Sequence, residues 1–86
     1  MNEILVNFVL QTDTNVEVKI PEDMIVEDAL EQLVESDLIN ALGANMEWFV
    51  AFKESGQVVD ISKTMAENGI TDGTVLRVAQ NARGCP

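Results

Sequence analysis

Residues 4–20 read ILVNFVLQTDTNVEVKI, and this stretch decides the fold. Apolar residues occupy every second position of two runs, which lie on either side of residues 11–15. In the first run these are Ile4, Val6, Phe8 and Leu10, and in the second Val16, Val18 and Ile20. Alternation with a period of two is typical of a half-buried β-strand. Because the residues between the runs are polar and turn-forming, the stretch predicts a β-hairpin.

A helix is predicted next along the chain. Pro21 ends the second strand, and Asp23 is the best candidate for the helix N-cap. Apolar residues then recur at helical spacing, at Val26, Ala29, Leu30, Leu33 and Val34. Carboxylates fill most of the opposite face, which we interpret as a solvated surface. We therefore expect an amphipathic helix of about three turns that covers one face of the sheet.

The remaining elements complete an α+β fold. They are a strand at 47–52, a short strand at 57–59, a helical turn at 64–68 and a last strand at 74–78. Residues 79–86 have no apolar period, which predicts a mobile tail. The sequence therefore predicts a mixed sheet of four to five strands with one central helix, in the order β-β-α-β-β-β. We expect a domain at 1–78 followed by a flexible C-terminal tail at 79–86.

The composition limits the class of protein and of partner. A chain of 86 residues forms one domain with a single core. Asp and Glu number 15 against 5 Lys and Arg, which gives a formal net charge of −10. This acidic excess argues against nucleic acid or a membrane surface as a partner, and it favours a basic groove on another protein. Histidine is absent, which excludes catalysis by Ser-His or Cys-His pairs.

A single cysteine, Cys85, stands next to the last residue. The chain can therefore form neither an internal disulfide nor a cysteine zinc cluster. Its first residues lack the basic segment of a signal peptide, and no apolar run reaches the roughly 18 residues of a membrane helix. The sequence also has no nucleophile elbow and no phosphate-binding glycine loop. We expect a cytoplasmic protein that is not an enzyme and binds no metal or cofactor of its own.

The order of the elements and several local motifs resemble the ubiquitin family, whose fold is the β-grasp. One match is the step Ile20-Pro21-Glu22-Asp23 between the hairpin and the helix. The strongest match is residues 63–78, KTMAENGITDGTVLRV, which is similar to the family's threonine-leucine, isoleucine, glycine and hydrophobic-x-hydrophobic ending. The resemblance spans essentially the whole chain at the level of pattern. It implies a β-grasp domain that other proteins act upon.

The last residues decide which branch of this family the chain resembles most. Arg83-Gly84 follows Val78 at the distance where ubiquitin-type modifiers carry an arginine-glycine step. One glycine stands where ubiquitin has two, and Cys85 and Pro86 follow it. The resemblance implies a precursor from which a peptidase removes these two residues. An E1-like enzyme would then use ATP to adenylate Gly84, and the glycine would pass through a cysteine of an E1-like or E2-like enzyme to a target protein.

Residues 47–52 are apolar at nearly every position. Alternation buries only one set of a strand's side chains, so the other set lies on the outer face of the sheet, and the pattern leaves open which one. In ubiquitin-like proteins this outer face is the main recognition surface, and small exposed apolar patches suit docking. The resemblance therefore implies a partner-binding patch of Phe49, Ala51, Arg77 and Ala79. Leu5 and Val9 offer a second apolar pair on that face.

Two other interpretations stay open. Small ubiquitin-like accessory proteins of type VII secretion, the YukD/EsaB group, share the ending Gly69-Ile70-Thr71-Asp72-Gly73 but typically stop just after the last strand. The eight residues after Val78 therefore favour a modifier. Sulfur carriers of the molybdopterin and thiamine pathways normally end in two glycines with nothing beyond, and this chain matches them less well.

Overall fold

A computed structural model of the protein describes residues 2–83. The predicted hairpin is confirmed, because β1 (Glu3–Val9) pairs antiparallel with β2 (Asn15–Pro21). Phe8 lies opposite Val16 and Ile4 opposite Ile20, so the apolar faces of the two strands coincide as the alternation predicts. The turn between them contains Asp13 in a left-handed conformation with φ 64°, which aspartate tolerates better than most residues.

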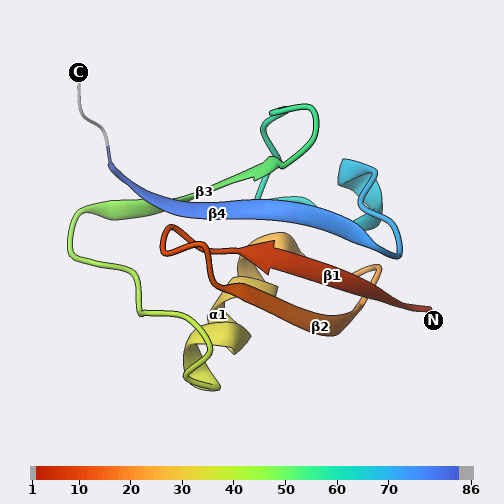
Figure 1. The fold of residues 1–86 in the computed structure, drawn as a ribbon, viewed down its shortest axis with the longest axis horizontal. Coiled ribbons are helices and arrows are strands. Elements are labelled where there is room, and N and C mark those ends of the chain that lie inside the picture. Colours follow the sequence, from red (N-terminus) through yellow and green to blue (C-terminus); the bar gives the residue numbers. More distant parts are fainter. Residues whose placement is uncertain (1, 84–86) are drawn as a thin grey trace.

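The sheet is completed by two strands from the second half of the chain (Figure 1). β4 (Thr74–Ala82) runs parallel to β1 and antiparallel to β3 (Met46–Phe52), and the strand order is β2-β1-β4-β3. One parallel pair among antiparallel ones makes the sheet mixed. The α+β fold class with a single central helix is therefore confirmed.

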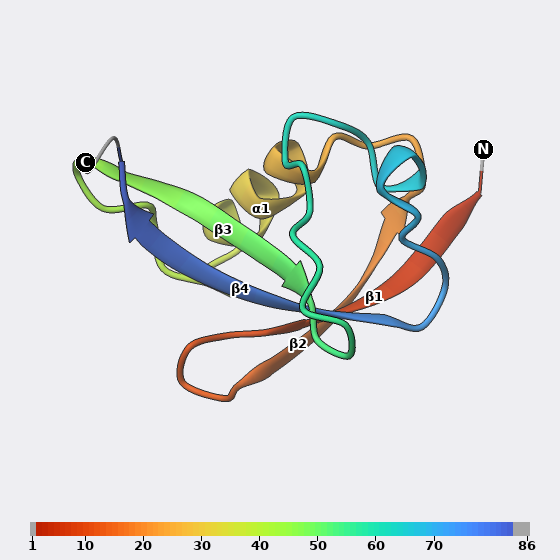
Figure 2. The same ribbon diagram turned by 90° about the horizontal axis from the view of Figure 1, so that it is seen from above.

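The helix α1 (Val26–Glu35) packs on one face of the sheet, as Figure 2 shows. Its buried side chains are Val26, Ala29, Leu30 and Leu33. They meet the inward side chains of the strands, among which Val6, Phe8 and Leu76 are fully buried. Burial of apolar surface is the main stabilising contribution in such a core, and each large apolar side chain contributes roughly 1.5–3 kcal/mol.

The predicted N-cap of the helix is wrong. The cap position is Ile25, and its side chain makes no capping hydrogen bond. The first two helical N–H groups, of Val26 and Glu27, donate instead to the carbonyl oxygens of Lys63 and Ile61, at 3.0 Å each. Backbone of a distant loop thus satisfies the donors for which Asp23 was expected.

The predicted short strand at 57–59 is reduced to one isolated bridge between Val58 and Ala51. The N–H of Val59 donates to the carbonyl of Val50 at 2.8 Å, and the N–H of Phe52 donates to the carbonyl of Gln57 at 2.9 Å. Val59 is buried, but Val58 is 61% exposed. Only one side chain of this pair, Val59, is buried, and one buried side chain does not hold the segment along β3 over a longer stretch.

The predicted end of the last strand, at Val78, is wrong. β4 continues four residues past Val78, and residues 79–82 pair with residues 46–49 of β3. The physical reason is that β3 begins early enough to offer its backbone donors and acceptors to this segment. The lack of an apolar period misled the prediction, because backbone pairing with a neighbouring strand requires no apolar side chains.

Candidate functional site

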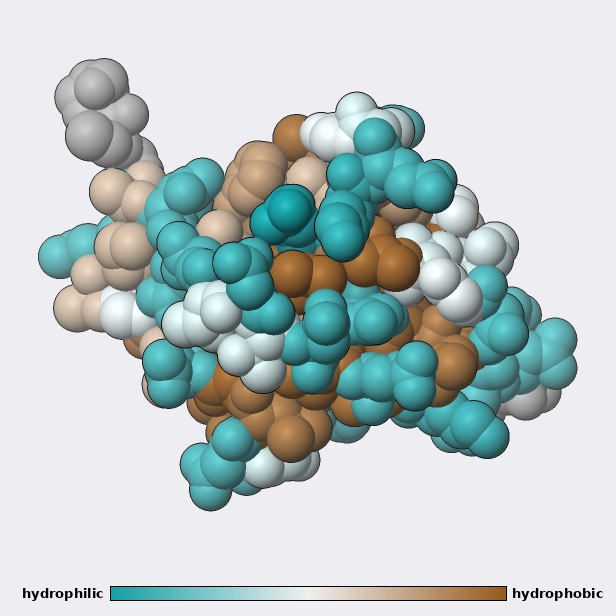
Figure 3. Space-filling model, in the orientation of Figure 1, coloured by the Kyte–Doolittle hydropathy of each residue, from teal (hydrophilic) through white to brown (hydrophobic). Residues whose placement is uncertain are grey.

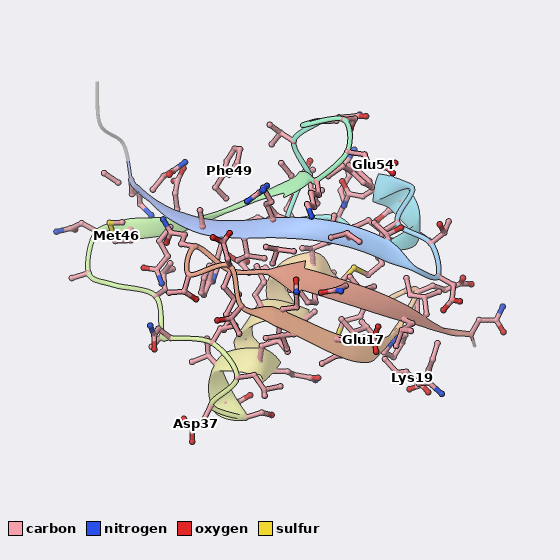
Figure 4. The ribbon with its side chains drawn as sticks, in the orientation of Figure 1. Glu17, Lys19, Asp37, Met46, Phe49 and Glu54 are labelled. Atoms are coloured by element: carbon pink, nitrogen blue, oxygen red, sulfur yellow. The ribbon has the colours of Figure 1, made fainter. Side chains whose placement is uncertain are left out.

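The four residues of the predicted patch lie together on the sheet face opposite α1. The register places Phe49 opposite Ala79 and Ala51 opposite Arg77 in the β3–β4 pair. Their neighbours Val50 and Val78 are buried in the core, so these four point the other way. Figure 4 shows Phe49 on the β3 side of this outer face. These four residues share the outer face in the structure, and their role as a partner-binding patch stays a prediction.

The members of the patch differ in how much surface they offer. Phe49 and Ala79 are half-buried, and Arg77 is exposed. Ala51 is only 6% exposed, as is Val9 on the other side of Arg77. The arginine thus stands between two small covered side chains, and its long stem is suited to shielding them. A partner would meet mainly Phe49, Arg77 and Ala79.

Apolar surface on this face is broken up by polar groups (Figure 3). Val75 on β4 is half-buried and lies opposite Asn7 of β1. The side-chain oxygen of Asn7 is buried and accepts no hydrogen bond from residues 2–83. A buried carbonyl without a hydrogen bond costs folding free energy, so Asn7 makes the folded state less stable than an apolar residue at this position would. This polar position could be recognised in the sequence, because Asn7 interrupts an otherwise apolar strand.

Of the residues predicted to take part in conjugation, Arg83 lies directly after β4. The N–H of Arg83 donates to the carbonyl of Asn45 at 2.7 Å, which extends the β3–β4 pairing by one contact. The side chain of Arg83 is exposed. Gly84 and Cys85 lie outside the described residues. The structure therefore places Arg83 directly after a paired strand.

A side chain of β4 also holds the loop that leads into β3. The Nε2 group of Gln80 donates to the carbonyl of Ala41 at 3.2 Å, and its Oε1 atom accepts the N–H of Gly43 at 3.0 Å. Gln80 lies opposite Trp48 in the register. This clamp was not predicted, because Gln80 falls in the segment that was expected to form a tail.

Two carboxylates of the loop before β4 make local hydrogen bonds. The Ser62 hydroxyl donates to Asp60 at 2.6 Å and its N–H donates to the same oxygen at 3.0 Å, and these bonds lower the pKa of Asp60. The Thr64 N–H donates to Glu67 and the Glu67 N–H donates to the Thr64 hydroxyl, both at 3.0 Å. This reciprocal pair is a capping box, and the bond from the Thr64 N–H is the main cause that lowers the pKa of Glu67. These groups stabilise a turn and contact nothing that suggests catalysis.

A groove that the sequence did not predict lies beside the helix. It lies between α1 and β3, has a volume of about 340 Å³, and is lined by Glu27, Glu31, Val34, Glu35, Leu42 and Trp48. The three apolar members are half-buried, and the three glutamates are exposed. The glutamates follow one another at intervals of four residues, which places them on one side of the helix. That spacing was visible in the sequence, but only the fold brings Trp48 beside it.

Within residues 2–83, no three Asp, Glu, His or Cys side chains come together in a way that could hold a metal ion. In the same part of the chain, none of the helices has the length and apolar character needed to cross a membrane.

Solved structures similar to this chain are ubiquitin-like domains. A de novo designed protein based on ubiquitin has a TM-score of 0.73 and 18% identity, with 98% of this chain and 95% of that chain covered. The UBL domain of Plasmodium falciparum Dsk2 has a TM-score of 0.71 and 18% identity, with 93% and 100% covered. A structure described as molecular mimicry of SUMO that promotes DNA repair has a TM-score of 0.74 and 15% identity, with 92% of each chain covered. At these identities the likeness shows a ubiquitin-like β-grasp fold.

A sequence family defines the chain more narrowly. The chain belongs to the family described as "Protein of Unknown function (DUF2604)", whose model matches residues 1–84. No curated protein matches the chain in sequence.

Proposed function

We propose that the protein is a ubiquitin-like modifier precursor that is cut after Gly84 and conjugated through that glycine. The observation that carries the proposal is the position of Arg83-Gly84, which follows β4 (Thr74–Ala82) directly in the sequence. The ubiquitin-like fold supports it. The outer-face patch supports it as well, because Phe49 and Ala79 lie near the end of the strand that leads to Gly84.

The proposed reactions require no catalytic residue from this chain. Peptide hydrolysis after Gly84 frees its carboxylate, which attacks the α-phosphate of ATP and releases pyrophosphate. A cysteine thiolate of the activating enzyme then displaces AMP to give a thioester, and an amine or hydroxyl of the target displaces that thiolate. Glycine has no Cβ, so its carbonyl is open to each nucleophile. The net charge of −10 would speed encounter with a basic enzyme surface.

The end of β4 sets a condition for this reaction. Residues 79–82 pair with β3, and the Arg83 N–H is bonded to Asn45. A chain advances at most about 3.5 Å per residue, so Gly84 reaches only about 7 Å beyond Ala82. The activating enzyme must either receive the end of the paired strand in a shallow site or separate residues 79–82 from β3.

The test uses the full chain with an N-terminal affinity tag, produced in the cell in which it naturally occurs. Intact mass should show loss of Cys85 and Pro86, and denaturing gels should show larger adducts whose junction peptide ends in Gly84. Gly84→Phe should abolish the adducts while leaving the fold unchanged. Cys85→Ser is the matched control, because it alters only the segment that is removed, and it should preserve them.

Two outcomes would contradict the proposal. One is that every cellular form of the folded chain retains Cys85 and Pro86. The other is that Gly84→Phe forms the same adducts as the unchanged protein.

A specific observation favours a second function, that of a non-conjugated accessory protein of a type VII secretion system. The segment 79–82 is part of β4, so the chain beyond the last strand is shorter than the sequence indicated. This weakens the contrast with accessory proteins that stop just after that strand. Under this alternative the intact 86-residue chain would co-purify with secretion components, and Gly84→Phe would not change that association.

A further inference from the structure

The outer edge of β3 is open along half its length. Val50 and Phe52 direct their backbone groups away from β4, since they bond to residues 59 and 57. Strand geometry alternates with a period of two, so Trp48 directs its N–H and carbonyl to the same edge. Within residues 2–83 no hydrogen-bond partner reaches these two groups of Trp48. Figure 2 looks onto this edge and shows the segment after β3 crossing only its C-terminal end.

The groove between α1 and β3 lies directly under this open edge, because the Trp48 side chain belongs to the face that α1 covers. Trp48, Val34 and Leu42 supply its apolar surface. We call this combination of the open β3 edge and the adjoining groove the β3 groove. An extended segment placed along it would gain backbone hydrogen bonds from Trp48 and side-chain contacts from the groove.

The negative charge of the β3 groove indicates which kind of segment it would bind. Glu27, Glu31 and Glu35 line it and no basic residue does. They repel one another at their spacing of four residues, and a cationic side chain between them and Trp48 would relieve that repulsion. Arginine suits this place, because its stem can lie on apolar surface and its guanidinium can contact both an indole ring and a carboxylate.

We propose that the β3 groove binds an extended segment of a partner protein that carries arginine or lysine at alternate positions, as an added strand beside β3. The inward-facing basic side chains cross Trp48 and Val34 and end beside the glutamates. The other edge strand, β2, adjoins a hollow of about 140 Å³ whose lining includes Lys19 and no carboxylate. A basic segment therefore prefers the β3 edge. This surface is separate from Gly84 and does not depend on conjugation.

The test uses the full chain and a synthetic peptide with blocked ends, Thr-Arg-Val-Arg-Val-Arg-Thr. Trp48 is the only tryptophan and tyrosine is absent, so intrinsic fluorescence reports on the β3 groove directly. A saturable change in Trp48 emission is expected. Hydrogen exchange should slow at least several-fold at the N–H groups of Trp48 and Val50, and should not change along β2.

Matched controls separate strand addition from general attraction to an acidic protein. A peptide of the same sequence in which the backbone N–H groups of the central arginine and of both valines are methylated has the same charge but lacks N–H groups on both edges of the strand. It should bind at least about tenfold more weakly in either strand direction. Glu31→Lys should weaken binding of the first peptide by about tenfold. Glu17→Lys makes the same charge change on the opposite face, on β2, and should weaken binding less than about twofold. Glu31→Gln is the milder variant if Glu31→Lys fails to fold.

The proposal is overturned by any of three results. The first is the absence of a saturable fluorescence change. The second is equal binding of the two peptides, or equal loss with Glu31→Lys and Glu17→Lys, which would indicate attraction by net charge alone. The third is slowed exchange along β2, which would place the peptide on the other edge.

Discussion

Replacement of Gln80 tests whether residues 79–82 form a paired strand or a mobile tail. In the structure the Gln80 side chain makes two hydrogen bonds to the loop before β3, at 3.0 and 3.2 Å. A typical intramolecular hydrogen bond contributes about 0.5–1.5 kcal/mol. Both bonds are at the surface, where water replaces a lost partner, so the lower part of that range applies. We expect Gln80→Ala to lower the free energy of unfolding by about 1–2 kcal/mol.

The assay is urea unfolding followed by Trp48 fluorescence, since Trp48 lies opposite Gln80. For a domain of this size the same change lowers the Tm by about 4–16 °C. Asn81→Ala is the control, because Asn81 is the next residue of β4, is exposed, and makes no side-chain hydrogen bond within residues 2–83; it should change stability by less than about 0.5 kcal/mol. If the two variants unfold alike, the clamp does not hold β4 past Val78 and residues 79–82 behave as a tail.

Three further predictions concern the body of the domain. A carboxyl group whose pKa is lower in the folded state stabilises that state above its unfolded pKa, and this contribution is lost as the pH falls through the folded pKa. Hydrogen bonds from Thr64 lower the pKa of Glu67, so Glu67→Gln should lose less stability than the wild type between about pH 6 and pH 3. Equal pH dependence of urea unfolding in the two proteins would contradict this role of the bond from the Thr64 N–H. Gly73 has φ 88° and an added Cβ would meet nothing within 4 Å, so Gly73→Ala should cost about 1–2 kcal/mol from backbone strain alone, and Gly73→Asn should cost less. Leu30 is fully buried, and Leu30→Ala should cost about 2–5 kcal/mol in calorimetry or urea unfolding; a loss below about 1 kcal/mol would mean that the core collapses around the missing side chain.

Most of the fold was predictable, because it depends on local periodicity. The alternation in residues 4–20 determined a hairpin, and the spacing of Val26, Ala29, Leu30 and Leu33 determined the face of α1 that is buried. The period of two also placed Phe49 and Ala51 on one face, but it left open whether that face is buried or outward. The glutamate spacing on α1 and the Thr64-x-x-Glu67 capping box were visible as well, but the sequence alone gave no reason to connect the first with a binding site.

Contacts between distant segments were decided only by the tertiary structure. The extent of β4 depends on where β3 begins, because strand pairing uses backbone groups that every residue carries, and so composition could not end the strand at Val78. The helix start depends on carbonyl groups of residues 61 and 63 in a remote loop. The β3 groove depends on the packing of α1 beside Trp48. The sequence by itself thus determined which side chains share a face in each element, and the assembled backbone decided which face of β3 is buried, how far β4 extends and which strand edge stays open.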